Sequence, residues 1–191
     1  MLKSEARALF LTKRKNISLE EKVLLDNSIL AEFKKIDLTA LKCIHIYLPI
    51  IAQNECNTYP IIDFIRENYP KINMAIPKAN FENGQMDAVF FNPETQLATN
   101  NLGIAEPING AAIDPMVIDM IICPLLAFDL KGNRVGYGKG FYDRFLGQCK
   151  SDVIKLGLSY FEPINNLTDC NESDLPLSSC ITPTQHYFFD R

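Results

Sequence analysis

The sequence has no tryptophan and two histidines, and its six cysteines include no pair at Cys-x-x-Cys spacing. The missing pairs exclude a zinc knuckle and a thioredoxin-type redox motif, so we expect reduced and mostly buried thiols. His45 lies in an apolar run, where we interpret it as a strand histidine with its hydrogen bonds satisfied. Little remains for a histidine-based catalytic triad.

Long apolar runs and an excess of positive charge are also missing. The longest candidate for a membrane span, residues 116–128, is interrupted by Asp119 and Pro124, and the N-terminus reaches Glu5 and Arg7 before a signal-peptide apolar region could develop. With 19 Lys and Arg against 23 Asp and Glu, the net charge is −4, so no overall basic field exists for nucleic acid or an anionic membrane. We therefore expect a cytoplasmic protein that binds neither.

The rest of the composition is that of an ordinary globular protein. Its 191 residues are 47% hydrophobic and 22% charged, which fits a single domain over residues 1–191. Periodicity predicts helices over 2–15, 18–35 and 60–68, and strands over 42–48, 72–77, 86–91, 117–123 and 153–160. Because the late strands are apolar on both faces and alternate with helices, we predict a layered α/β/α sandwich, Rossmann-like, with a mostly parallel (mixed) sheet. Residues 92–115 read as a long loop with room for a short hairpin.

Glycine is concentrated in one short stretch. Four of the nine glycines fall within nine positions: Gly132, Gly136, Gly138 and Gly140. Glycine lets backbone amides approach a ligand, and the N-terminus of the predicted following helix favours an anion, so this stretch indicates phosphate binding. Lys139 within the loop and Arg134 before it would add positive charge. A flexible hairpin without a ligand is the alternative interpretation.

Two known phosphate-binding fingerprints do not match this stretch. The dinucleotide fingerprint requires glycine where Phe141 stands, and the Walker pattern requires Ser or Thr where Gly140 stands. Asp143 follows in the first turn of the predicted helix, where a carboxylate complements the helix dipole. Beside a polyphosphate it would be repelled unless a cation lay between them, so Asp143 is a magnesium candidate.

The first predicted helix carries a stripe of basic residues. Lys3, Arg7 and Arg14 fall within an arc of about 40° bordering the apolar face, so their charged heads can reach a bound anion. A solvated basic face is the simpler interpretation of the stripe by itself. The stripe becomes specific only in combination with the glycine loop.

Residues 134–144 resemble the signature Arg-Leu-Gly-x-Gly-Gly/Lys-Gly-Tyr-Tyr-Asp-Arg of the 5-formyltetrahydrofolate cyclo-ligase, or methenyltetrahydrofolate synthetase, family. The resemblance extends over nearly the whole chain through a series of short motifs: Lys3 and Arg7, Glu55 to Thr58, Lys78, Met86 and Asp87, Gly103 to Pro107, Pro124 to Asp129, Asp174, and Ile181 with Thr182. Together these motifs are far more specific than any one of them.

The resemblance implies three groups of site residues. The implied ATP site is formed by Lys3, Arg7, Arg134, Gly136, Tyr137, Gly138, Lys139, Gly140, Phe141 and Tyr142, of which Arg134, Lys139 and Tyr142 are the candidates for catalysis. The implied magnesium ligands are Asp143 and Asp174, and the implied folate contacts are Ile50, Glu55, Asn57 and Tyr137. Two positions depart from the family's pattern, because Asn57 stands where an acidic residue is usual and Phe141 where a tyrosine is usual.

The activity that the resemblance implies is the ATP-dependent cyclisation of 5-formyltetrahydrofolate to 5,10-methenyltetrahydrofolate, with release of ADP and phosphate. It implies phosphorylation of the formyl oxygen and attack by N10, carried out with Mg²⁺ by a monomer. Two alternatives share the glycine loop. A different magnesium-ATP phosphoryl-transfer enzyme, such as a small-molecule kinase, would leave a phosphorylated product, and a non-catalytic nucleotide-binding regulator would bind ATP without formylfolate-dependent hydrolysis.

Overall fold

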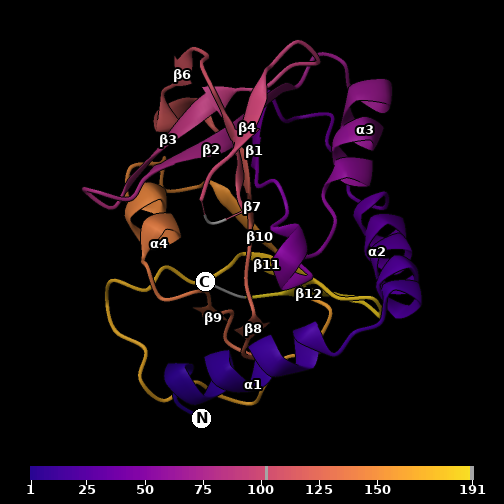
Figure 1. Cartoon of the computed structure of the whole chain (residues 1–191), viewed down its shortest axis with the longest axis vertical. Helices are drawn as coiled ribbons and strands as arrows, with labels where there is room; N and C mark the ends of the chain where they lie inside the picture. The colour runs from indigo at the N-terminus through magenta and orange to yellow at the C-terminus, as the bar shows by residue number, and fades with distance from the viewer. Residues whose placement is uncertain (102, 190–191) are drawn as a thin grey trace.

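One mixed sheet organises the chain in the computed structural model, which describes residues 1–101 and 103–189 (Figure 1). In the described chain this sheet has eight strands in the order β12-β11-β10-β7-β1-β2-β3-β6. Neighbouring strands from β11 to β2 are parallel, whereas β12, β3 and β6 pair antiparallel at the two edges. The strands are β1 Cys43–Ile46, β2 Asn73–Asn80, β3 Gln85–Phe90, β6 Ala112–Ile113, β7 Met120–Cys123, β10 Ile154–Leu158, β11 Ser179–Ile181 and β12 His186–Phe188.

The helices begin close to where the sequence predicts them. They are α1 Lys3–Lys15, α2 Leu19–Phe33, α3 Tyr59–Asn68 and α4 Phe141–Leu146, with 3₁₀ turns at Ile51–Gln53 and Pro115–Val117. At the start of α2 the Ser18 hydroxyl accepts a hydrogen bond from the Glu21 N–H at 3.1 Å, and Pro60 lies in the first turn of α3. The helix predicted after the glycine loop is α4, which has six residues.

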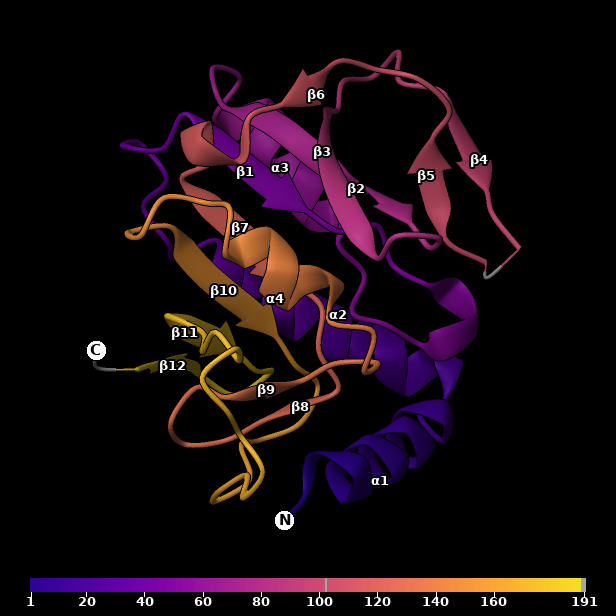
Figure 2. The same ribbon diagram turned by 90° about the vertical axis from the view of Figure 1, so that its left-hand side faces the viewer.

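The two faces of the sheet are covered unequally. Along β1, Ile44 and Ile46 pack with the helices α2 and α3, whereas Cys43 packs in the cluster that contains Phe145 of α4. Figure 2 shows α4 in front of the sheet and α2 and α3 behind it. The predicted layered α/β/α fold with a mostly parallel sheet is therefore confirmed, with one layer reduced to a single short helix and loops.

Two hairpins stand outside the main sheet. The strands β4 Leu97–Thr99 and β5 Ala105–Pro107 form the short hairpin for which the long loop had room. The strands β8 Ala127–Phe128 and β9 Arg134–Val135 form a second hairpin that was not predicted. Buried Asp129 holds its turn, because its side chain accepts hydrogen bonds from the backbone of 131, 133 and 167.

The helix α1 lies against the second hairpin, where Ala6 and Phe10 pack with Val135 and its neighbours (Figure 1). This contact places the N-terminal helix beside the residues that lead into the glycine loop. No helix in the part of the chain that the structure describes is long and apolar enough to cross a membrane.

The prediction for the cysteines is confirmed, whereas one part of the prediction for His45 is not. All six cysteines are free, and four of them are buried, as expected: Cys43, Cys56, Cys123 and Cys180. His45 is fully buried in β1, but neither ring nitrogen has a hydrogen-bond partner among the described residues. The expectation that it is satisfied was wrong, because its ring faces the rings of Phe145 and Tyr142 instead of polar groups. Burial lowers the pKa of His45 to about 3.

Candidate active site

A cleft of about 750 Å³ opens at the carboxyl ends of β1 and β7. These strands are neighbours at the centre of the sheet, and the chain continues from β1 to β2 on one side and returns to β7 on the other. Such a reversal of strand order is where α/β sheets bind ligands. Tyr47 and Leu48 line the cleft just after β1, and Pro124 just after β7. Its volume is in the range of roughly 300–1,000 Å³ that is usual for small-molecule sites.

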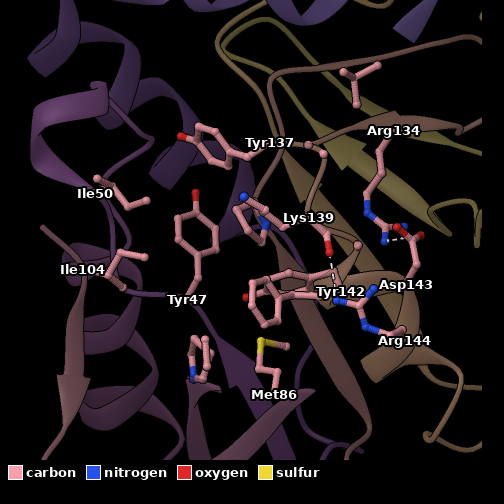
Figure 3. A pocket seen from close by; sticks show the side chains of 18 of the residues that line it. Tyr47, Ile50, Met86, Ile104, Arg134, Tyr137, Lys139, Tyr142, Asp143 and Arg144 are labelled. Carbon is pink, nitrogen blue, oxygen red and sulfur yellow. Dashed lines mark hydrogen bonds and ion pairs between the residues drawn. The ribbon is translucent and has the colours of Figure 1, made fainter. Parts of the chain in front are cut away.

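The cleft has two chemically different sides (Figure 3). The cationic wall consists of Lys3, Arg7, Arg134 and Lys139, together with the carboxylates that pair with them. The Glu55 wall consists of Tyr47, Ile50, Glu55, Ile104 and Tyr137. Figure 3 shows Tyr47, Ile50 and Ile104 across the cleft from Arg134, Asp143 and Arg144.

Arg7 joins the helix α1 to the glycine loop. Its Nε donates a hydrogen bond to the carbonyl oxygen of Gly136 at 2.9 Å. Gly138 has a φ of +86°, and a Cβ added there would lie 3.2 Å from the Arg7 guanidinium carbon. The positive φ therefore favours glycine at 138, and a larger side chain there would also push the Arg7 guanidinium aside by a few tenths of an ångström. The solvated-face interpretation of the basic stripe is wrong for Arg7, because its side chain is directed at the loop.

Arg144 fixes the other end of the loop. Its guanidinium donates to the carbonyl oxygens of Gly84 and Lys139, both at 2.8 Å. The ring of Phe141 packs edge-on against Phe81, with 5.1 Å between centroids, and so ties the loop to the β2–β3 hairpin a second time. The backbone of Lys139 is thus held while its side chain is exposed and lines the cleft.

The two magnesium candidates are each paired with a cation. Asp143 Oδ1 lies 2.7 Å from the Arg134 guanidinium, and Asp174 forms an ion pair with the Lys3 ammonium. Partial burial raises the pKa of Asp174. The hydrogen bonds from the Lys3 ammonium and from the Asn171 N–H outweigh this effect, so the pKa of Asp174 is lowered overall. All four paired side chains line the cleft. Among the described residues there is no cluster of three or more His, Cys, Asp or Glu that could hold a metal.

The Glu55 wall is built from hydrogen bonds inside the protein. The Glu55 side chain is 3% exposed, and its two oxygens accept one bond from the Tyr137 hydroxyl and one from the Ile50 N–H, both at 2.7 Å. Burial raises the pKa of Glu55, while these two hydrogen bonds and the charge of Arg14 oppose the rise. Three of the four predicted folate residues, Ile50, Glu55 and Tyr137, therefore lie together on this wall of the cleft.

Asn57, the fourth predicted folate residue, does not line the cleft. Its side-chain oxygen accepts a hydrogen bond from the Tyr59 N–H at 3.2 Å, in the turn that leads into α3. Its backbone N–H donates to Asp26 on α2. The structure thus places Asn57 between two helices, away from the ring-lined space next to Glu55.

Comparison with known proteins decides the family. The model of the 5-formyltetrahydrofolate cyclo-ligase family matches residues 1–183. The chain belongs to this family. It is 30% identical over 161 residues to the 5-formyltetrahydrofolate cyclo-ligase of Mycoplasma genitalium, covering 83% of this chain and 84% of that protein. It is 32% identical over 192 aligned positions to the enzyme of that name from Mus musculus, covering 94% and 89%.

Solved structures of the family share the fold. The NMR structure of Aquifex aeolicus 5,10-methenyltetrahydrofolate synthetase superposes with a TM-score of 0.83 at 30% identity, covering 100% of this chain and 94% of that one. The structure of the synthetase from Mycoplasma pneumoniae has a TM-score of 0.74 at 28% identity, covering 95% and 98%. Because these relatives are all named for one ligase, the chain is an enzyme of the cyclo-ligase family.

Some residues of this family member's cleft were not predicted. Tyr47 and Ile104 line it, and Arg14 and Arg144 hold its loop. Arg14 was visible in the basic stripe and Arg144 ended the recognised signature, but neither pattern indicated what the side chain contacts. Tyr142, predicted as an ATP-binding and catalytic residue, lines the cleft, and its buried hydroxyl has no hydrogen-bond partner among the described residues.

Proposed function

We propose that the protein converts 5-formyltetrahydrofolate to 5,10-methenyltetrahydrofolate, using ATP and releasing ADP and phosphate. The observation that carries this proposal is the pairing of two unlike walls in one cleft. The cationic wall suits a polyphosphate, whereas the Glu55 wall offers rings, an aliphatic side chain and a buried carboxylate to a flat heterocycle with N–H donors. A cleft built this way brings two ligands of different chemistry into contact.

The chemistry requires activation of an amide-like group. The formyl oxygen is a poor leaving group and the formyl carbon a weak electrophile. In the proposed reaction the formyl oxygen attacks the γ-phosphorus of ATP and ADP departs. N10 then attacks the formyl carbon, the carbon–oxygen bond breaks, phosphate leaves, and N10 loses its proton to solvent. Each step depends mainly on alignment and on neutralising charge.

The residues of the cleft fit those two tasks. Lys139 is exposed in the cleft and has no ion pair among the described residues, so it is free to approach the transferring phosphoryl group. Arg134 supplies a second positive charge from the base of the loop. The unpartnered hydroxyl of Tyr142 can donate a hydrogen bond to the reacting oxygen.

Magnesium fits the pair formed by Asp143 and Asp174. Mg²⁺ is usually bound by one or two carboxylates, with phosphate oxygens and water completing the octahedron, and both carboxylates open on the cleft. In the bound state Lys3 and Arg134, which now pair with them, can turn to the phosphates. The ion would neutralise charge on the phosphates. We further propose that the enzyme works as a monomer, because one chain supplies both walls.

The test is a mixture of the protein, magnesium-ATP and 5-formyltetrahydrofolate, followed by the near-ultraviolet absorbance of the methenyl product and by ADP release. We expect both signals to rise together. A persistent phosphorylated folate without the absorbance change would indicate a kinase. ATP binding without formylfolate-dependent ADP release would indicate a regulator. Either result with folded protein would overturn the proposal.

A further inference from the structure

Arg14 is a buried cation that holds the glycine loop but whose charge has no assigned role in ligand binding. It lies near the end of α1 and is 4% exposed. Its guanidinium donates to the Leu125 carbonyl oxygen at 3.2 Å and to the Tyr137 hydroxyl, and it lies 5.5 Å from the centre of the Tyr137 ring. No ion pair among the described residues includes it. A positive charge buried against neutral partners is costly, so its presence requires an explanation.

The contacts of Arg14 lead to the Glu55 wall. The Tyr137 hydroxyl that accepts from Arg14 donates in turn to Glu55 Oε1 at 2.7 Å. The other oxygen of Glu55 accepts from the Ile50 N–H. Because the Tyr137 hydroxyl oxygen accepts a hydrogen bond from Arg14, its proton is directed away from Arg14 and toward Glu55. This chain of bonds connects α1, the glycine loop and the segment after β1.

We propose that Arg14 is a positioning residue for the folate side of the cleft. Through the Tyr137 hydroxyl, Arg14 holds Glu55 in place as an anion. The Glu55 carboxylate then accepts hydrogen bonds from N–H donors of the bound heterocycle. This inference rests on the proposed function. It assigns the buried charge a task that differs from that of Arg7, which lies on the same helix but contacts the phosphate-side backbone of the loop.

The charges around Glu55 support this role. Burial raises the pKa of Glu55, and the Ile50 N–H, the Tyr137 hydroxyl, the Arg14 charge and the Lys22 charge lower it, in that order. Lys22 on α2 is already paired with Asp26 at 2.7 Å. The other titratable neighbours are neutral groups whose pKa burial raises: Tyr47, Tyr137, Tyr142, Tyr160 and Cys56. Of the two nearby cations, Lys22 forms an ion pair and Arg14 forms none among the described residues.

The sign of the effect follows from these contacts. Removing the Arg14 charge removes one influence that lowers the pKa of Glu55, so this carboxyl is protonated up to a higher pH. Binding that needs the carboxylate is then lost at the acidic end of the range. The acidic limb of the pH profile for folate should move to higher pH, whereas ATP binding, which uses the opposite wall, should not change.

The experiment compares three variants with the wild type. Arg14→Met keeps the stem and deletes the charge, Arg14→Lys keeps the charge, and Lys15→Met is the control, because Lys15 is the exposed neighbour on α1. For each we measure the pH profile of kcat/KM for 5-formyltetrahydrofolate and the affinities for this folate and for ATP by calorimetry. For Arg14→Met we expect an acidic limb higher by about one pH unit and, at the pH of the wild-type midpoint, a folate affinity about fivefold weaker.

The controls separate positioning from folding. Arg14→Lys should bring the acidic limb most of the way back to the wild-type pH, and Lys15→Met should match the wild type. The ATP affinity of all three variants should stay within about twofold of the wild type. Tyr137→Phe, which keeps the ring and removes the hydroxyl link, should reproduce the shifted limb of Arg14→Met. An unshifted limb in folded Arg14→Met, or equal losses of folate and ATP affinity, would overturn the inference.

The proposed function can fail separately. A wild type that binds the folate but forms no methenyl product would overturn the proposed reaction, and the calorimetric comparison of folate binding by the wild type and Arg14→Met across pH would still decide the role of Arg14. A wild type that binds no folate would overturn both.

Discussion

The two walls of the cleft are held in different ways. The cationic wall contains two ion pairs, Lys3 with Asp174 and Arg134 with Asp143, and the exposed Lys139, which has no ion pair among the described residues. The Glu55 wall is made of buried groups that bond to the protein interior, and Glu55 itself is 3% exposed. Ion pairs near solvent contribute little to stability and exchange partners readily, whereas buried networks are rigid. The comparison teaches that the cationic wall can rearrange around a ligand and that the hydrogen-bonded part of the Glu55 wall is formed in advance.

The largest expected effect tests the exposed side. Lys139→Met keeps the stem and deletes the charge that faces the transferring phosphoryl group, so turnover should fall by about a hundredfold or more. The melting temperature should barely change, because the side chain is exposed. Steady-state kinetics and a thermal melt measure both quantities. Near-normal turnover would assign Lys139 to solvent and remove the central charge from the cationic wall.

A second prediction concerns the paired carboxylates. Asp143→Asn should abolish most activity at ordinary magnesium concentration and raise the concentration of magnesium that is required, because a hard anionic oxygen is lost. Asp174→Asn should show the same magnesium-dependent loss, and Asp152→Asn, at an exposed position on the surface, should show none. If Asp143 is only the partner of Arg134 and of the helix dipole, the variant loses about 0.5 kcal/mol of stability and keeps its turnover. That result would refute the metal assignment.

A third prediction separates the two walls directly. Arg7→Ala removes the hydrogen bond to Gly136 and a charge beside the loop, so ATP affinity should fall by about tenfold or more. Folate affinity should change less, because the Glu55 wall does not include Arg7. Calorimetric titration of both ligands measures the difference, with Lys15→Ala as the exposed basic control on the same helix. Equal losses for the two ligands would show that the walls are not independent.

The smallest effect on catalysis is expected at His45, which belongs to neither wall. Its pKa is about 3 in the folded protein and about 6.5 in the unfolded chain, so below pH 6.5 the unfolded state binds a proton that the folded state does not. The free energy of unfolding should therefore fall by about 1.4 kcal/mol per pH unit from pH 6.5 toward 3 on account of this residue. Denaturant titrations at pH 7 and pH 5 should show that His45→Leu loses less stability than the wild type over this interval. Turnover at pH 7 should stay within about twofold. An equal loss of stability in both proteins would contradict the burial argument.

The sequence predicts most of the regular elements because their periodicity is local. Residues 2–15 and 153–160 each carry an unbroken pattern, and the structure confirms a helix and a strand there. The β8–β9 hairpin was missed because its strands have two residues each, and its turn depends on Asp129 bonding as far away as Leu167. Short strands stabilised by distant partners leave no periodic signal.

Some residues of the candidate site could likewise be predicted from the sequence, and others could not. The glycine loop and Arg7 could be associated from the sequence, because a glycine-rich loop and a basic stripe together favour an anion and both match motifs of the family. Arg14 and Arg144 could not be assigned, since their roles lie in contacts with carbonyl and hydroxyl groups of other segments. The family resemblance placed Asn57 near the folate, but its side chain bonds to the backbone of Tyr59 in the turn before α3. Sequence motifs thus predict which residues face a ligand better than they predict which residues hold those in place.

The pair formed by Lys3 and Asp174 has a consequence for biosynthesis. Its two members are 171 positions apart, and the N-terminal segment also bonds to the backbone of 166 and 168. The helix α1 emerges from the ribosome before residues 166–174, so it is made without these partners. The apolar side of α1, with Ala6 and Phe10, therefore lacks its cover from Leu167 until that residue has been made. Because the Lys3–Asp174 pair joins the two segments, the cationic wall can be completed only after the rest of the cleft lining has been made.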